Sequence, residues 1–212
     1  MLTPSNLARR ILLVIILVSV VLSIYFYPQF PAQIASHWNA RGDVNGYMPK
    51  FPGLFLMPML LSVLFVLFSI IPVIDPLKAN IRKFREYFEK FIVLLFAFLL
   101  YIQLLTIIWN LGVRFDMTLF ILPALALLFF YIGILMEKAR RNWFIGIRTP
   151  WTMSSDKVWA NTHRLGSKLY KLVALITIAG LFFRQYALII FIVSAVSVTV
   201  ITIVYSYIEY RR

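Results

Sequence analysis

The stretch FIVLLFAFLLYIQLLTIIWNL, residues Phe91–Leu111, contains no charged side chain. Its most polar side chains are the uncharged ones of Gln103, Thr106 and Asn110. A helix needs about 20 predominantly apolar residues to cross the hydrocarbon core of a bilayer, and a single segment satisfies its backbone amides there only as a helix. The stretch therefore predicts a transmembrane helix and makes the chain a membrane protein.

Five further apolar runs flank this helix. The run Leu172–Phe183 is shorter than a full crossing, but Leu169 and Tyr170 can extend it while nearby lysines reach back to the interface. A re-entrant segment is the alternative for this run. With Phe91–Leu111, the runs predict an all-α polytopic membrane protein with six transmembrane helices. The five are Ile11–Tyr27, Leu54–Ile74, Thr118–Met136, Leu172–Phe183 and Tyr186–Ile208.

The composition also indicates a membrane protein, since 62% of the residues are hydrophobic and 14% are charged. Soluble domains carry about 25% charged residues. Cysteine is absent, which excludes disulfides, zinc–thiolate sites and iron–sulfur sites. The first apolar run is longer than a signal-peptide core and lacks a small-residue cleavage site, so we expect it to remain as a helix.

Lysine and arginine gather on one side of the predicted bundle. With six crossings and both termini inside, all but four of the 21 basic residues fall on the cytoplasmic side, where membrane proteins concentrate them. The net charge of +13 then indicates contact with anionic membrane lipids, and no nucleic-acid-binding motif accompanies it. The four basic residues that fall outside the cytoplasmic side are Arg41, Lys50, Arg114 and Arg184.

This topology predicts two parts. Residues 1–74 hold the first two helices with an external loop at 28–52. Residues 75–212 hold four further helices with a cytoplasmic loop at 137–170. Both termini are predicted to be cytoplasmic.

The external loop reads PQFPAQIASHWNARGDVNGYMPKFP. Asn45-Gly46 is typical of a tight turn between strands, so we expect a small β-hairpin with Ile34–Trp38 as one strand. His37 and Trp38 would lie on opposite faces of that strand. One histidine with the distant Asp43 is a poor set of metal ligands, so we interpret His37 as a hydrogen-bonding loop residue and predict no metal site.

The cytoplasmic loop reads EKARRNWFIGIRTPWTMSSDKVWANTHRLGSKLY. Gly146 and Pro150 indicate turns of the backbone. Ser154 or Ser155, followed by Asp156, is typical of a helix start, because a hydroxyl caps free amides and an acid suits the positive end of the helix dipole. A helix is therefore predicted from Asp156 into the fifth apolar run.

On that helix, Trp159, His163, Gly166 and Tyr170 recur at helical spacing and form one largely aromatic face. Tryptophan favours the headgroup level of a membrane, so the simplest interpretation is a loop and helix anchored at the inner interface. A docking surface for a partner is one alternative. Catalysis at His163 is another, although no nucleophile is visible beside it. The docking surface would comprise Arg148, Trp151, Trp159, His163 and Arg164.

Gln103, Thr106 and Asn110 share one face of the third predicted helix, because they are spaced three and four residues apart. Hydrogen bonding to a neighbouring helix is the simpler interpretation, and a solute path is the alternative. No predicted helix carries a charge at its centre, which argues against a proton-coupled or ion-coupled transporter.

Both loops resemble known families. The pattern Pro31-x-x-Ile34, His37-Trp38-Asn39, Gly42, Gly46-Tyr47 and Lys50 looks like a domain of unknown function found beside the first helix of bacterial membrane proteins. The pattern Asn142-Trp143-Phe144-Ile145-Gly146-Ile147-Arg148-Thr149-Pro150-Trp151-Thr152, Val158-Trp159 and Thr162-His163-Arg164-x-Gly166 resembles the signature of the SdpI family.

The resemblance implies an immunity protein of the bacterial cell membrane that protects against a secreted, membrane-active peptide toxin. It also implies signalling, in which the toxin-engaged protein holds a winged-helix repressor at the membrane. The predicted partners are therefore the toxin, the repressor and membrane lipids, without direct binding of nucleic acid. A membrane enzyme or transporter acting on lipid or envelope material through Arg148 and His163 is the alternative function, and a structural subunit of a larger membrane assembly is a third.

The hypothesis assigns site residues to both loops, and it predicts no catalytic residue, metal or cofactor. The toxin-facing candidates are His37, Trp38, Asn39 and Tyr47. The cytoplasmic candidates for partner binding are Asn142, Gly146, Arg148, Thr149, Pro150, Trp151, Trp159, His163 and Arg164.

Overall fold

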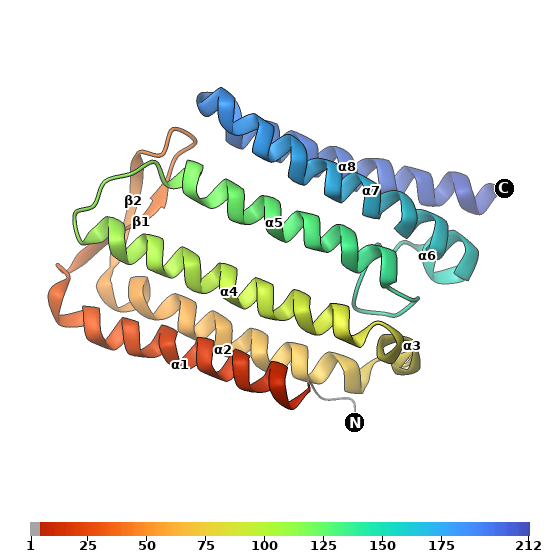
Figure 1. Ribbon diagram of the computed structural model, residues 1–212, viewed down its shortest axis with the longest axis horizontal. Coiled ribbons are helices and arrows are strands. Elements are labelled where there is room, and N and C mark those ends of the chain that lie inside the picture. Colours follow the sequence, from red (N-terminus) through yellow and green to blue (C-terminus); the bar gives the residue numbers. More distant parts are fainter. Residues whose placement is uncertain (1–4) are drawn as a thin grey trace.

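The computed structural model describes residues 5–212 as a bundle of long helices with one small sheet (Figure 1). Residues 1–4 of the first predicted part lie outside the described residues. The long helices are α1 (Asn6–Phe26), α2 (Lys50–Ile74), α4 (Arg85–Asn110), α5 (Met117–Lys138), α7 (Asp156–Gly180) and α8 (Ala187–Arg211). The short elements are η1 (Tyr27–Gln29), β1 (Gln33–Trp38), β2 (Val44–Pro49), α3 (Lys78–Lys83), α6 (Pro150–Ser154) and η2 (Leu181–Tyr186).

Among the described residues, five helical segments are long and apolar enough to cross a membrane. The last of them, Asp156–Arg211, is 56 residues long and contains α7, η2 and α8. Phe183 leaves helical geometry within η2 (φ −104°, ψ 45°), and α8 folds back against α7. Six crossings follow only if α7 and α8 are counted separately, so the number six stays a prediction.

The bundle presents apolar side chains to its surroundings along every long helix. Leu17, Leu175 and Val196, for example, are each about 60% exposed. Apolar surface of this extent is not found on soluble monomers, and lipid is the solvent that suits it. The predicted class, an all-α polytopic membrane protein, is confirmed.

The two ends of the bundle differ (Figure 1). At one end, the hairpin end, lies the sheet of β1 and β2. At the other, the signature end, lie α3, α6 and residues 139–149, together with the first turn of α1 and the last turn of α8. The predicted division at residue 74 stays a prediction, and α1 packs on both α2 and α4 across that boundary.

The most extensive helix packing is between α5 and α7, which run side by side. Gly133 of α5 makes this approach possible, because a Cβ there would lie 2.7 Å from the main-chain oxygen of Ser167. Ser155 caps α7 through its hydroxyl, which accepts from the amide of Val158. Asp156 follows in the first turn. The predicted helix start is confirmed.

The β-hairpin exists, but the predicted turn at Asn45-Gly46 is wrong. Both residues lie within β2, and the chain reverses over residues 39–43 instead. There the side chain of Asn39 accepts from the amides of Arg41 and Asp43, and Gly42 adopts a positive φ of 80°. This local hydrogen bonding sets the turn before Val44, the first residue of β2, and not at Asn45-Gly46 as the sequence pattern indicated.

Candidate functional site

Asn142 organises the loop that follows α5. Its side chain is fully buried and makes four hydrogen bonds. The oxygen accepts from the amides of Phe144 (3.0 Å) and Ile145 (2.6 Å). The nitrogen donates to the carbonyl oxygens of Arg140 and Ile145, both at 2.8 Å. One amide side chain therefore folds the loop around itself and leaves no atom of its own for a ligand.

Asp75, which directly follows α2, and Asn80 of α3 hold this loop in place. The buried carboxylate of Asp75 accepts from the amides of Leu77 (2.6 Å) and Trp143 (2.9 Å). Asn80 donates to the carbonyl oxygen of Arg141 at 2.8 Å. The sequence interpretation missed both residues. A lone acid such as Asp75 in a loop rich in lysine and arginine resembles an exposed charge.

Gly146, Trp159 and His163 form the tightest contact of the signature end. The indole of Trp159 stacks on the imidazole of His163, with ring centroids 3.9 Å apart. The amide of Ile147 donates to Nε2 of His163 (3.1 Å), and Nδ1 lies 2.9 Å from the carbonyl oxygen of Trp159. A carbonyl oxygen only accepts, so the proton of the neutral imidazole is on Nδ1. Both ring nitrogens are thus engaged with the backbone, which gives His163 a structural role in this arrangement.

Thr149 and Pro150 begin α6 and connect it to α8. Thr149 and Thr152 form a reciprocal capping box, and Pro150 occupies the first turn, where its missing amide hydrogen has no cost. The hydroxyl of Thr149 lies 3.0 Å from that of Ser206 on α8. Thr152, which belongs to the signature pattern but was not among the site candidates, and Ser206, which the sequence interpretation missed, are fully buried.

The remaining cytoplasmic candidates are spread over different surfaces. Trp151 packs against Tyr207 of α8, with centroids 5.1 Å apart. Arg148 is exposed and donates to the carbonyl oxygen of Trp143. Arg164 is exposed and borders a cavity together with Trp159 and His163. Arg148 and Trp151 do not line this cavity. Five residues predicted as one docking surface are therefore not contiguous.

The aromatic face of α7 does not supply the predicted interfacial contact, and the place of the loop at the inner interface stays a prediction that depends on other side chains, such as the exposed Trp143. Trp159 is 3% and His163 is 2% exposed, and Gly166 is buried. Trp159 also donates from Nε1 to the carbonyl oxygen of Ala139 (3.0 Å). Residues 139–147 cover this face of α7, so it packs against the protein's own loop. Helical spacing showed that the residues share a face but not what lies against it.

At the hairpin end, the four toxin-facing candidates have different environments. His37 is exposed and its Nδ1 lies 2.5 Å from the side-chain oxygen of Asn45. Trp38 packs edge-to-face on Trp109 of α4, with centroids 5.6 Å apart. Asn39 shapes the turn, and Tyr47 is 64% exposed on β2.

The polar face of α4 fastens α1 and the hairpin. Gln103 accepts from the hydroxyl of Ser19 and donates to that of Ser23 (2.9 Å), both on α1. Asn110 accepts from the amide of Ala35 (2.8 Å) and donates to its carbonyl oxygen (3.0 Å). The hydroxyl of Thr106 donates to the carbonyl oxygen of Ile102 within the same helix. These contacts supply the partners that polar groups in an apolar environment require.

A cavity of about 260 Å³ lies between the hairpin, α2, α4 and α5. We call it the hairpin cavity. His37, Trp38, Gln103 and Thr106 all border it, so two groups of residues singled out separately in the sequence meet here. Three methionines also line it, namely Met48, Met57 and Met117.

Nothing in residues 5–212 indicates a metal centre, since no group of three or more His, Cys, Asp or Glu side chains comes together there.

Comparisons with known proteins match both ends of the bundle. Residues 14–61, from α1 through the hairpin into α2, match a domain of unknown function (DUF1648). Residues 138–206, from the end of α5 into α8, match the SdpI/YfhL protein family. Immunity protein SdpI of Bacillus subtilis (strain 168) is 26% identical over 201 residues, which cover 94% of each chain. No solved structure matches the chain. Segments at both ends of the bundle are thus similar to known families, and the chain is similar along nearly its whole length to an SdpI immunity protein.

Proposed function

We propose that this protein is an immunity protein of a bacterial cell membrane, and that it protects the cell by binding part of a secreted, membrane-active peptide in the hairpin cavity. The name of its relative, Immunity protein SdpI, supports the general function. The distribution of Lys and Arg supports an orientation with the hairpin end outside and the signature end in the cytoplasm. A peptide arriving from outside would then meet the hairpin first.

The observation that carries the proposal is the lining of the hairpin cavity. Most of its surface is apolar, and its methionines are flexible and polarisable, so they adapt to side chains of different shape. The buried Nε1 of Trp38, which borders the cavity, has no hydrogen-bond partner among residues 5–212. A buried donor without a partner costs about 1–3 kcal/mol, and a peptide carbonyl oxygen would relieve that cost.

A hydrophobic peptide offers the two groups that this cavity accepts. Its apolar side chains suit the methionine-lined wall, and its backbone carbonyl oxygens suit the indole N–H of Trp38. His37 is exposed and borders the cavity, and Tyr47 is exposed on β2 next to Met48 of the lining, so both would contact the rest of the peptide. Asn39 acts indirectly, through the shape of the turn.

The test is survival of a sensitive strain challenged with a purified secreted peptide toxin. Wild-type protein is expected to protect, and Trp38→Ala is expected to reduce survival to that of an empty vector, because both the wall and the donor are lost. Trp38→Phe keeps an aromatic six-membered ring in the wall but loses the five-membered ring of the indole with its N–H, so we expect about a tenfold higher sensitivity than wild type. Immunoblots of membranes would show that all variants are present at equal amounts.

Trp143→Phe is the matched control, because Trp143 is exposed at the signature end and lies outside the hairpin cavity. It should protect as wild type does. Full protection by Trp38→Ala, or no protection by the wild-type protein against any such peptide, would contradict the proposal.

We also propose, from the family resemblance, that the signature end receives a winged-helix repressor. The exposed Trp143, Phe144 and Arg148 at this end support such a contact, since aromatic and arginine side chains are enriched in protein interfaces. We expect the double variant Trp143→Ala with Arg148→Ala to lose co-purification of the repressor. The control variant Tyr47→Ala, at the hairpin end, should co-purify with the repressor as wild type does. Co-purification that is unchanged in the double variant would refute it.

A further inference from the structure

A second cavity, at the signature end, has a strongly basic lining. Its volume is about 580 Å³, and it lies between α3, the end of α5, residues 139–141 and the first turns of α7. We call it the basic cavity. Ligand cavities in proteins commonly have volumes of about 300–1,000 Å³. The charged residues of its lining are Lys83, Glu137, Arg140, Arg141, Asp156 and Arg164.

The two carboxylates of the basic cavity are already paired. Glu137 lies 3.2 Å from the ammonium of Lys138 and 3.1 Å from that of Lys171. Asp156 lies 2.8 Å from Nε of Arg141. Neither acid is therefore free to neutralise the other cations of the lining.

Three cations remain, from three separate parts of the chain. Lys83 comes from α3, Arg140 from the segment after α5, and Arg164 from α7. Within residues 5–212, their side chains form no ion pair and no hydrogen bond. Like charges gathered around one concave surface repel each other and focus a positive potential into it. An anion in the cavity would be attracted by all three.

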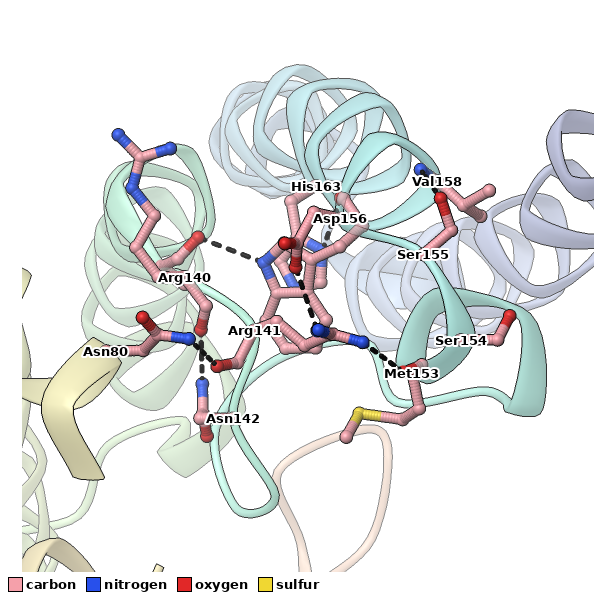
Figure 2. Close-up of polar contacts among 12 residues, drawn as sticks. Asn80, Arg140, Arg141, Asn142, Met153, Ser154, Ser155, Asp156, Val158 and His163 are labelled. Atoms are coloured by element: carbon pink, nitrogen blue, oxygen red, sulfur yellow. Dashed lines mark hydrogen bonds and ion pairs between the residues drawn. The ribbon is translucent and has the colours of Figure 1, made fainter. Parts of the chain in front are cut away.

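The backbone that carries Arg140 is held on three consecutive residues (Figure 2). The carbonyl oxygens of Ala139, Arg140 and Arg141 accept from Trp159, Asn142 and Asn80, respectively, at 3.0, 2.8 and 2.8 Å. Arg141 is fixed further by donating to the carbonyl oxygen of Met153 (2.7 Å). In Figure 2 the guanidinium of Arg140 extends away from these contacts. A fixed backbone with a free guanidinium suits binding, because little further backbone ordering is needed.

We propose that the basic cavity is a binding site for a phosphate-bearing anion, held by Arg140 and Arg164 with Lys83. Arginine binds phosphate with paired N–H donors, and lysine adds a point charge. The volume leaves room for a group attached to the phosphate, such as the glycerol of a phospholipid headgroup or the remainder of a soluble phosphate compound. The elements that line this site lie at the opposite end of the bundle from the hairpin, so the proposal does not rest on toxin binding in the hairpin cavity (Figure 1).

The test uses the purified full-length protein and follows thermal unfolding by tryptophan fluorescence. One arm titrates inorganic pyrophosphate into protein held in phosphatidylcholine nanodiscs, at constant ionic strength. The other arm compares nanodiscs of phosphatidylcholine with nanodiscs that also contain phosphatidylglycerol. We expect a rise in the unfolding temperature in at least one arm. A rise only with phosphatidylglycerol identifies a lipid headgroup, and a rise with pyrophosphate identifies a soluble phosphate compound.

The variant Arg140→Gln with Arg164→Gln removes two of the three free cations. Each charged hydrogen bond contributes about a tenfold factor in affinity, so we expect binding in the responding arm to weaken at least about tenfold. The matched control is Arg9→Gln with Arg10→Gln, which removes the same charge from exposed residues of α1 at the same end of the bundle. It should change binding less than about twofold. Equal losses in the two double variants, or no response of the wild-type protein to either probe, would overturn the proposal.

Discussion

Replacing Gly146 by alanine is expected to lower the free energy of unfolding by about 3 kcal/mol or more. Gly146 has a φ of 118°, which an L-residue with a side chain rarely adopts. An added Cβ would also collide with Nε2 of His163 and would lie 3.2 Å from the ring of Trp159. Nε2 of His163 accepts a hydrogen bond from the amide of Ile147, so the collision would separate the loop of residues 139–149 from α7. Thermal unfolding of the purified protein measures the loss.

Gly112→Ala is the matched control for this prediction. Gly112 has a similar φ of 103°, but no atom lies within 4 Å of its Cβ position. The control therefore carries the backbone strain alone, about 1 kcal/mol. Equal losses in Gly146→Ala and Gly112→Ala would show that the contact with His163 and Trp159 contributes nothing.

Replacing Asn142 by leucine is expected to cost at least about 3 kcal/mol, because four backbone groups, two of them in fully buried hydrogen bonds, lose their partner and leucine has a similarly branched but apolar side chain. Those groups are the amides of Phe144 and Ile145 and the carbonyl oxygens of Arg140 and Ile145. Asn142→Asp keeps both acceptor bonds and loses both donors, so its loss should be intermediate. The same unfolding measurement ranks the two variants.

Asn161→Leu serves as the control for Asn142. The side chain of Asn161 is half-buried and donates to Glu209 of α8 (2.7 Å), without any bond to the backbone of the loop. Its loss should be about 1 kcal/mol, the net contribution of one hydrogen bond. If Asn142→Leu unfolds at the same temperature as Asn161→Leu, the central place of Asn142 in the loop is refuted.

The local features of the fold could be predicted from the sequence. Uncharged runs of sufficient length predict helices in lipid irrespective of what surrounds them, and the start of α7 at Ser155 and Asp156 follows from groups within one helical turn. The existence of the hairpin was also predicted, with Ile34–Trp38 as one strand, although from a turn at Asn45-Gly46 that lies within β2. Each of these inferences depends on residues that are neighbours along the chain.

Features that depend on distant residues could not be predicted in this way. The spacing of Trp159 and His163 indicates a shared face, but only the path of residues 139–147 decides that this face is buried. Asp75 is buried because the amide of Trp143, 68 residues later, points at it. Within the hairpin, two turn-forming patterns competed, and the side-chain hydrogen bonds of Asn39 decided between them.

The two cavities have opposite chemistry and lie at opposite ends of the bundle. The hairpin cavity is apolar with one free donor, which suits a hydrophobic peptide, and the basic cavity suits a phosphate group. Their proposed roles require that the hairpin end be exposed to the cell exterior while the signature end is in contact with the cytoplasm. The orientation of the bundle in the membrane is therefore the central claim.

Cysteine labelling tests this claim directly, because the natural chain contains no cysteine. Tyr47→Cys at the hairpin end and Trp143→Cys at the signature end both replace exposed side chains. In intact cells, a membrane-impermeant maleimide should label Tyr47→Cys at once and Trp143→Cys only after the membrane is permeabilised. Labelling of both variants from the same side would contradict the account.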